Sequence, residues 1–310
     1  MTPTIVIVGA ASRDLTDEDP RGWRLGGGVT YSALVSARLG VPTGALMGVD
    51  ALSADAHELD LLRAAGVELR TVVLDRAPVF RNIERPEGRL QLSAGPADAV
   101  PPDAIPEAWL SAPGWILTPV AAELPDAWAD APSAEATVAV GWQGLLRELP
   151  VDGPVRQTIP EPAPIIARAD IVGISRDDVD PAISLDTLAA HLHRRATLVV
   201  TQGDRGGVVM ETGPDGSRRL RHYPPVRARD VADATGAGDV FLAAFAAARI
   251  EPRLVGGRIA AGFDLLLAAT AASLTIEGIG LHGVPDRAAV RERMLEVRAT
   301  AQPGPMAPGD

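Results

Sequence analysis

The stretch DVADATGAGDVFLAAFAAARI, residues 230–250, sets two acids and three small residues directly before an apolar helical sequence. Gly236, Ala237 and Gly238 stand between Asp233 and Asp239. Glycines at a helix entrance leave backbone N–H groups uncovered, and these amides together with the helix dipole attract an anion. Asp239 is then either a first-turn acid favoured by the dipole or a general base held beside a bound phosphate. Spacing alone leaves both interpretations open.

Two absences exclude whole classes of site. The chain has no Cys, which excludes disulfides, thiolate metal sites and a Cys nucleophile. It also has no Lys, so every basic residue apart from His is Arg. A Walker A loop, a protein-kinase strand lysine and a Schiff-base amine are therefore excluded.

The charge balance bears on the partners. The formal net charge of −11 argues against a general nucleic-acid or anionic-membrane binder. An anionic ligand would need local positive potential from helix N-termini, arginines or a metal. No apolar run approaches the ~20 residues of a membrane span, and residues 1–10 lack the basic start of a signal peptide. We expect a cytoplasmic protein, monomeric or homodimeric, whose partners are small molecules.

The elements that must position these residues alternate along the chain. Short β-branched runs such as TIVIV alternate with amphipathic helical stretches over 310 residues. This pattern predicts an α/β fold: a doubly wound, mostly parallel sheet with helices on both faces and ligands at the carboxyl ends of the strands. Five positions fall at such ends: Gly9, Gly141, Ser175, Gly203 and the loop from Asp233 to Asp239.

Helices are expected where apolar periodicity is bounded by capping signals. Ser53 and Ser184 are predicted N-caps, and Gly40 and Gly66 are predicted helix stops. An Asp215–Gly216 turn predicts a hairpin. The predicted helices cover about 29–39, 54–65, 184–195, 239–250, 257–274 and 286–299.

One segment interrupts the alternation. Residues 69–93 contain short alternating runs separated by turn signals such as PEG, which predict two or three antiparallel strands. We interpret them as a small inserted β lid, with parts of 11–25 as further candidates. The expected organisation is one domain over 1–300 and a disordered tail over 301–310.

Three motifs in this order resemble those of the ribokinase-like, or PfkB, family of carbohydrate kinases. They are the Gly-rich stretch GGGVTYSALVSARLG, the strand and loop VVTQGDRGG at 199–207, and a D-T-x-G-A-G-D signature that begins at Asp233. In the signature Ala234 replaces the usual first Thr. The resemblance covers Gly9 to about Pro285. It implies the ribokinase-like fold and phosphoryl transfer from ATP, with Mg²⁺ and with a monovalent cation as a further candidate.

The resemblance also implies roles for individual residues. Asp239 matches the base that takes a proton from the attacking hydroxyl, and the amides of Gly236, Ala237 and Gly238 match an anion hole for the phosphoryl group. The family's N-x-x-E motif, which organises Mg²⁺ through water, is replaced by S-R-D-D, so Asp178 is the metal candidate and a helix-entry acid is the alternative. Nucleotide-binding positions are Ser175, Thr201, Gly203, Gly206 and Thr235.

On the substrate side, the family's hydroxyl-binding acid after the first strand matches Asp14, with an exposed loop acid as the alternative. The stretches GGGVTYSAL and VGWQGLLR resemble the myo-inositol kinase branch, although that branch usually has Asp where Gly141 stands. For Arg147 the alternative to substrate binding is a structural role, as a helix residue that forms a salt bridge. The further substrate-binding residues implied are Gly27, Gly28, Tyr31, Gln143 and Arg147.

The expected function is ATP-dependent phosphorylation of a small sugar or polyol, with myo-inositol as the candidate acceptor. The alternatives are a ribose or nucleoside kinase of the same fold and a non-catalytic nucleotide- or sugar-binding regulator. His191 and His193 are two residues apart on a predicted helix and do not share a face, so they are not expected to form a metal pair.

Overall fold

A nine-stranded sheet forms the centre of the molecule. The computed structural model describes residues 2–85, 88–213, 215–253, 255 and 262–301. The strand order is β16-β15-β14-β13-β9-β8-β1-β4-β5. Neighbours from β14 to β5 are parallel, whereas β15 and β16 add an antiparallel edge. The expected fold class, a mostly parallel α/β sheet covered by helices, is confirmed.

The central strands are apolar because both faces of the sheet are covered. Every residue of β1 and β4 is buried. The strands of this sheet are β1 Ile5–Ala10, β4 Thr43–Val49, β5 Glu68–Val73, β8 Gly114–Leu117, β9 Thr137–Gly141, β13 Ile171–Ser175, β14 Thr197–Thr201, β15 Gly207–Thr212 and β16 Arg218–Tyr223.

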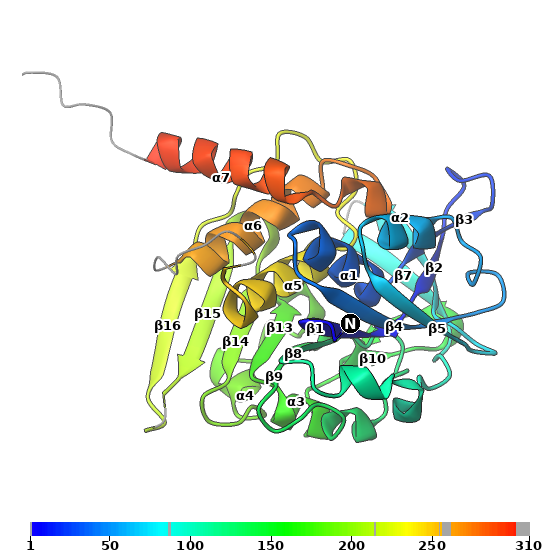
Figure 1. Ribbon diagram of the computed structural model, residues 1–310, viewed down its shortest axis with the longest axis horizontal. Helices are drawn as coiled ribbons and strands as arrows, with labels where there is room; N and C mark the ends of the chain where they lie inside the picture. Colours follow the sequence, from blue (N-terminus) through cyan, green and yellow to red (C-terminus); the bar gives the residue numbers. More distant parts are fainter. Residues whose placement is uncertain (1, 86–87, 214, 254, 256–261, 302–310) are drawn as a thin grey trace, which may run out of the picture.

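Helices cover both faces of the sheet (Figure 1). Helices α1, α5, α6 and α7 lie on one side, and α3 and α4 lie on the other. Helix α5 is buried along most of its length because it packs between the sheet and α6. The helices are α1 Gly28–Arg38, α2 Glu58–Ala64, α3 Pro164–Arg168, α4 Leu185–Ala189, α5 Ala237–Ile250, α6 Phe263–Thr275 and α7 Arg287–Ala301.

Two helix predictions need correction at their ends. Helix α2 begins at Glu58 rather than 54, because Ser53 closes a turn in which its hydroxyl bonds the Asp50 carboxylate at 2.7 Å instead of capping a helix. Ser184 does cap α4 through the Thr187 N–H at 3.0 Å, but that helix ends at Ala189 rather than near 195.

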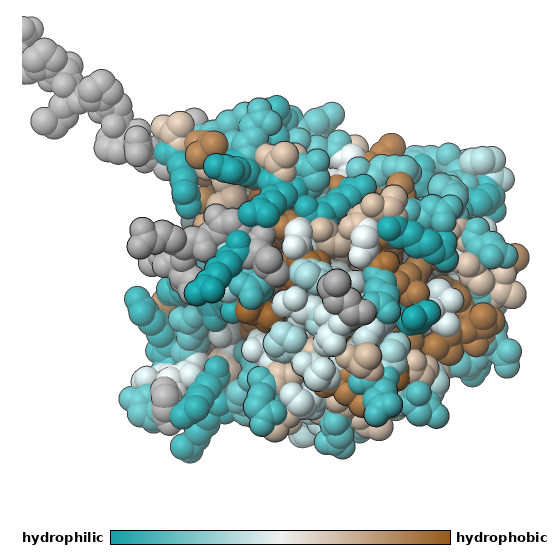
Figure 2. Space-filling view, viewed as in Figure 1, coloured by the Kyte–Doolittle hydropathy of each residue, from teal (hydrophilic) through white to brown (hydrophobic). Residues whose placement is uncertain are grey.

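The bounds of the last two helices agree more closely with the predicted ones. The predicted helix over 257–274 starts partly outside the described residues, and α6 begins at Phe263. Helix α7 includes Ala301, so the first residue of the predicted tail is helical, and 302–310 lie outside the described residues. No described helix is long and apolar enough to cross a membrane. Polar side chains cover much of the face shown in Figure 2, including that of α7.

A second, five-stranded sheet lies over the carboxyl ends of the central strands and has the order β11-β7-β6-β2-β3. We call it the lid sheet. The expected insert at 69–93 is wrong at its start, because residues 69–73 belong to β5 and pair in parallel with β4 at the edge of the large sheet. A half-buried edge strand alternates in polarity as a lid strand does. The lid strands are β2 Ser12–Leu15, β3 Trp23–Gly26, β6 Val79–Arg85, β7 Gly88–Ala94 and β11 Val151–Pro154.

The hairpin of β2 and β3 is tied to the large domain by a buried acid. Glu58 at the start of α2 accepts two bonds from the Arg21 guanidinium, at 2.5 and 2.9 Å, and a third from the Leu25 N–H at 3.2 Å. The Arg21 guanidinium also lies 4.4 Å from the centre of the Trp23 ring. Burial alone would raise the pKa of Glu58, but these bonds hold it below its ordinary value.

We expect Glu58→Gln to lower the free energy of unfolding by about 1.5–3 kcal/mol, because the Arg21 guanidinium loses a charged acceptor. The lost stability should be greatest at neutral pH and should shrink as pH falls through the lowered pKa of Glu58, since protonation abolishes the same interaction in the wild type. Urea unfolding at several pH values measures this. Asp60→Asn, which breaks the exposed pair with Arg63, is the control and should cost at most about 1 kcal/mol. Equal losses in the two variants would contradict the assignment.

Candidate active site

The loop before α5 is shaped by close contact with α1. Gly236 is the N-cap of α5 and has a left-handed backbone with φ 77°, which favours glycine. A Cβ at Gly236 would overlap the ring of Tyr31 on α1. At Gly238, in contrast, a Cβ would meet no described atom within 4 Å. The loop is thus packed on its Tyr31 side and has room for a ligand at Gly238.

The two acids of the signature have different environments. Asp233 is a loop-forming acid: its Oδ1 accepts the Thr235 N–H at 2.9 Å and its Oδ2 accepts the Gly280 N–H at 3.0 Å. These bonds tie the loop to the segment that follows α6. Asp239, in the first turn of α5, is a partly buried carboxylate beside the N-terminus of α1. A Cβ added to Gly28 would lie 2.7 Å from Asp239 Oδ1, so only glycine leaves room there.

The pKa of the Asp239 carboxyl is raised towards neutral pH. Burial is the main cause that raises its pKa, to about 7, and nearby Asp178 and Asp14 raise it further while Arg147 lowers it. A carboxyl with this pKa is partly ionised at neutral pH. It can therefore both accept and release a proton under ordinary conditions, as a general base must.

Asp14 lies at the base of the lid sheet rather than in an exposed loop. Its Oδ1 accepts the Ser12 hydroxyl at 2.8 Å, and a Cβ at Gly26 on the paired strand β3 would overlap its carboxylate. Tyr31 is 2% exposed, and burial followed by the charges of Asp14, Asp233 and Asp239 raises its pKa well above the ordinary value. These acids and the Tyr31 hydroxyl therefore share one electrostatic environment.

A third group near Asp239 is centred on Asp178, whose charge acts on Asp239. Asp178 Oδ1 accepts the Gln143 amide at 2.7 Å and lies 3.7 Å from Arg147 Nη2. Arg147 begins the short strand β10, Arg147–Glu148, and is not helical. Burial lowers the pKa of the guanidinium, while Asp178 and Asp239 oppose the shift. Within the described part of the chain, no hydrogen bond to the Arg147 guanidinium is found, so its donors can receive an oxyanion.

The Asp178 carboxylate is already engaged by protein groups, so it does not fit direct coordination of Mg²⁺. Besides Gln143 on Oδ1, it accepts the Ser175 N–H at 3.3 Å on Oδ2 and faces a guanidinium. The bond to Ser175 belongs to a capping box, which is the helix-entry role given above as the alternative. Among the described residues no group of three or more His, Asp or Glu could hold a metal.

The expected nucleotide-side residues lie at neighbouring strand ends. Ser175 and Thr201 are register partners at the ends of β13 and β14. Gly203 has φ 57° and a Cβ there would meet nothing within 4 Å, whereas a Cβ at Gly206 would overlap the Tyr223 carbonyl of β16. Gly206 is therefore explained by packing of the β15–β16 edge, while Gly203 borders open space. The Thr235 N–H is held by Asp233 in the loop before α5.

Sequence reasoning missed Thr118 at the end of β8. A Cβ at Gly9 would lie 2.7 Å from Thr118 Oγ1, and a Cβ at Gly28 would lie 2.9 Å from Thr118 Cβ. This threonine is therefore beside the glycine that borders Asp239. The signal was present, since Thr118 is the first polar residue after the buried strand GWIL, and open α/β sheets generally bind ligands at that edge.

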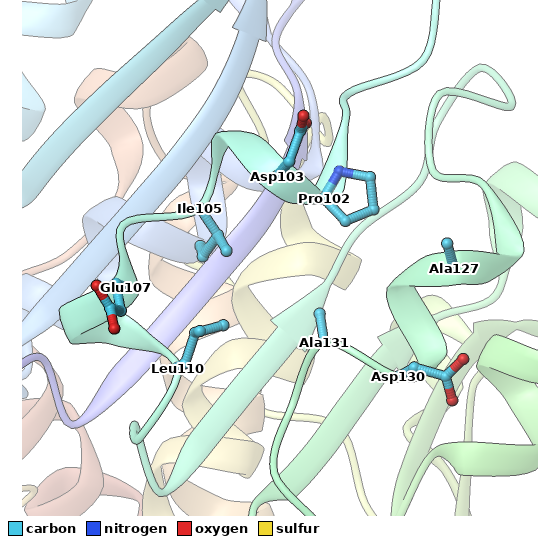
Figure 3. A pocket seen from close by; sticks show the side chains of 8 residues that line it. All are labelled: Pro102, Asp103, Ile105, Glu107, Leu110, Ala127, Asp130 and Ala131. Atoms are coloured by element: carbon cyan, nitrogen blue, oxygen red, sulfur yellow. The ribbon is translucent and has the colours of Figure 1, made fainter.

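A surface cavity of about 510 Å³ lies elsewhere, among the short 3₁₀ turns on either side of β8 (Figure 3). It has an apolar floor and three acids, and none of its eight lining residues is basic. It offers nothing to a phosphate group. The lining residues are Pro102, Asp103, Ile105, Glu107, Leu110, Ala127, Asp130 and Ala131.

Comparisons with known proteins bear on the family resemblance and the fold. Residues 165–286 match the profile described as "pfkB family carbohydrate kinase". No relative was found among curated protein sequences. The expected resemblance to the PfkB family is confirmed, and the match supports a phosphotransferase.

Solved structures show the same fold at low sequence identity. A pyrophosphate-dependent kinase in the ribokinase family, complexed with a pyrophosphate analog and myo-inositol, has a TM-score of 0.71 at 17% identity, covering 93% of this chain and 99% of its own. Arabidopsis thaliana ribokinase with ribose and ATP has a TM-score of 0.64 at 20% identity, covering 95% and 99%. A Methanocaldococcus jannaschii nucleoside kinase has a TM-score of 0.65 at 16% identity, covering 96% and 100%. The fold is therefore ribokinase-like.

Proposed function

We propose that this chain, whose residues 165–286 match the PfkB carbohydrate kinases, transfers the terminal phosphoryl group of ATP to a hydroxyl of a small sugar or polyol. One observation carries the proposal. Asp239 is a partly buried carboxylate with a pKa raised to about 7, and it lies against Gly28 of α1 in the first turn of α5, at a helix entrance that attracts anions.

The chemistry follows from this placement. Asp239 takes the proton of the acceptor hydroxyl, whose oxygen attacks the terminal phosphorus as the bond to the departing diphosphate breaks. The amides at Gly236 and Gly238 face the equatorial oxygens of the moving phosphoryl group, together with that of Ala237, whose N–H is held only by a long 3.5 Å bond to the Ala234 carbonyl. Charge developing on those oxygens is then stabilised without a lysine. Mg²⁺ bound to the donor phosphates would supply further charge neutralisation.

The acceptor pocket is proposed to lie between the lid sheet and α1. The Asp14 carboxylate accepts hydrogen bonds from acceptor hydroxyls, and Gly27 and Gly28 let a ring approach the helix backbone. Gln143 has one amide hydrogen engaged by Asp178, which leaves its carbonyl oxygen as an acceptor. These polar groups can pair with several hydroxyls of a cyclic polyol at once. An acceptor that lacks one of those hydroxyls leaves a buried polar group of the protein unpaired.

We propose myo-inositol or a similar polyol as the acceptor. The two sequence stretches that resemble the inositol branch supply this preference, and one structural neighbour holds myo-inositol. Ribose or a nucleoside is the alternative, since other neighbours are a ribokinase and a nucleoside kinase. Pyrophosphate is a second candidate donor, because that inositol-bound neighbour is pyrophosphate-dependent.

A panel assay tests the proposal. The purified protein is incubated with Mg²⁺ and either ATP or pyrophosphate, together with inositols, pentoses, hexoses or nucleosides, and product release is measured. We expect at least one inositol to be turned over with a kcat/KM at least about tenfold above that for ribose, because one unpaired buried group costs about 1–3 kcal/mol. Tenfold preference for ribose or a nucleoside would reject the polyol assignment. A blank across the panel would favour a non-catalytic regulator.

A further inference from the structure

Glu123, in the loop after β8, is a completely buried carboxylate that the chemistry above does not use. Its exposed fraction is 0%. It accepts three backbone N–H groups: Ala10 at 3.1 Å, Val120 at 3.0 Å and Ala121 at 2.7 Å. Among the described ion pairs none includes Glu123, so backbone amides alone satisfy the charge. Such a carboxylate fixes the backbone around it, because each donor would be left unpaired without it.

The loop is bent to bring this carboxylate back under its own backbone. Ala122 has φ 62°, a left-handed conformation that residues with a Cβ rarely adopt. The bend places the carboxylate below residues 120 and 121 and beside Ala10, the last residue of β1. Asp14 follows on β2 only four positions later. The strained backbone at Ala122 persists because the hydrogen bonds of Glu123 hold the loop in this conformation.

The base of the lid sheet rests on this loop. Val120 and Ala121 form a buried cluster with Phe80 of β6 and with Leu149, which precedes β11. The segment that leaves β7 is bonded to the same loop, since the Ala97 N–H donates to the Ala121 carbonyl at 2.9 Å. The Val100 N–H likewise donates to the Glu123 carbonyl at 2.8 Å. Several chain crossings between lid and large domain therefore meet at residues 118–124.

The segment that carries Gln143 and Arg147 also packs against the loop after β8, at Pro119 and Val120. A Cβ at Gly144 would overlap the carbonyl of Pro119 and lie 2.6 Å from the Val120 nitrogen. The two backbones are thus in direct contact, one residue from Gln143. A shift of the Pro119–Val120 peptide must therefore move the segment that places the guanidinium near Asp239.

We propose that Glu123 is a positioning residue for phosphoryl transfer: it holds the loop on which both the lid and the Gln143–Arg147 segment are seated. It touches no reacting group. Its effect passes through Phe80 and Leu149 to the lid that covers the acceptor, and through Gly144 to Arg147. This inference rests on the proposed function for its kinetic consequences, but not for its structural ones.

Glu123→Gln tests the proposal, because the amide keeps the volume and puts an NH₂ group where N–H donors converge. We expect kcat/KM for the acceptor to fall about 10–100-fold, in line with the loss of a buried acceptor, while the KM for the phosphate donor stays within about twofold. Hydrogen exchange of β6, β7 and residues 143–148 should be at least about tenfold faster than in the wild type. Asp170→Asn is the matched control: Asp170 accepts the Val138 N–H at 2.8 Å, at the opposite end of the sheet.

Gly144→Ala provides a second route to the same segment if Glu123→Gln does not fold. The added methyl group pushes on Pro119 and should reproduce the selective loss in acceptor kcat/KM. The proposal is overturned if either folded variant keeps both wild-type acceptor kinetics and wild-type exchange, or if Asp170→Asn shows the same selective effect. A wild-type protein that turns over no acceptor would refute the proposed function alone, and exchange in Glu123→Gln would still decide the role of Glu123.

Discussion

Asp239→Asn is expected to lower kcat by about 10²- to 10⁴-fold, the usual contribution of a positioned general base. An amide of the same shape still fits against Gly28, so substrate binding and the fold should persist while the proton acceptor is lost. Single-turnover phosphoryl transfer at saturating substrates measures the effect. Turnover within tenfold of the wild type would reject Asp239 as the base.

Asp233→Asn is the matched control for this prediction. Its carboxylate bonds the N–H groups of Thr235 and Gly280, so the change weakens the loop rather than the chemistry. We expect a measurable loss of stability, about 1–3 kcal/mol, and a smaller loss of kcat than for Asp239→Asn. The reverse order of kcat effects would exchange the roles of the two acids.

The pKa of Asp239 also predicts two opposite pH effects. A base must be ionised, so kcat/KM should rise with pH up to about 7 and be level above it. The free energy of unfolding should change in the opposite direction. The folded state binds the proton of the Asp239 carboxyl more tightly than the unfolded state does. Stability therefore falls as pH rises from the ordinary pKa of Asp towards 7. Asp239→Asn removes this cost and should be the more stable protein above pH 7, by up to roughly 4 kcal/mol. Urea unfolding at pH 5 and pH 8.5 checks the sign.

Arg147→Ala is the second large effect. We expect kcat/KM for the acceptor to fall by about 10²-fold, because a buried guanidinium that faces Asp178 and Asp239 is removed. Arg147 also lowers the pKa of Asp239, so its loss should raise that pKa and move the acid limb of the rate profile to higher pH. The KM for ATP should change little. Steady-state kinetics from pH 5 to 9 measure both consequences.

Arg156→Ala serves as the control for Arg147→Ala. Arg156 lies on the paired strand β12, Arg156–Gln157, but it is exposed and bonds only the exposed Glu148 among the described residues. Its removal should leave both kcat/KM and the acid limb near the wild-type values. An unshifted acid limb in Arg147→Ala would show that the guanidinium does not act on Asp239, even if acceptor binding were weaker.

Local features of the site could be predicted from the sequence because their causes are local. A run of glycines before an apolar helix exposes amides wherever it occurs, and this held for the N-cap at Gly236 and the first-turn acid Asp239. Buried parallel strands were also predictable, since both faces of strands such as β1 must be apolar. Polar residues after those strands then predicted the edge of the sheet at which ligands bind.

Tertiary structure alone decided which residues share the site. Residues 69–73 and the lid strands have the same alternating pattern, and only pairing with β4 assigns the former to the large sheet. The bond from Gln143 to Asp178 joins residues 35 positions apart, and no spacing rule brings such groups together. Nothing in the sequence singles out Glu123, because charged residues are rarely buried, yet three backbone amides from the ends of two separate strands hold it inside. Capping and burial patterns act over one turn or one strand, whereas these contacts exist only once the lid has folded onto the carboxyl ends of the sheet.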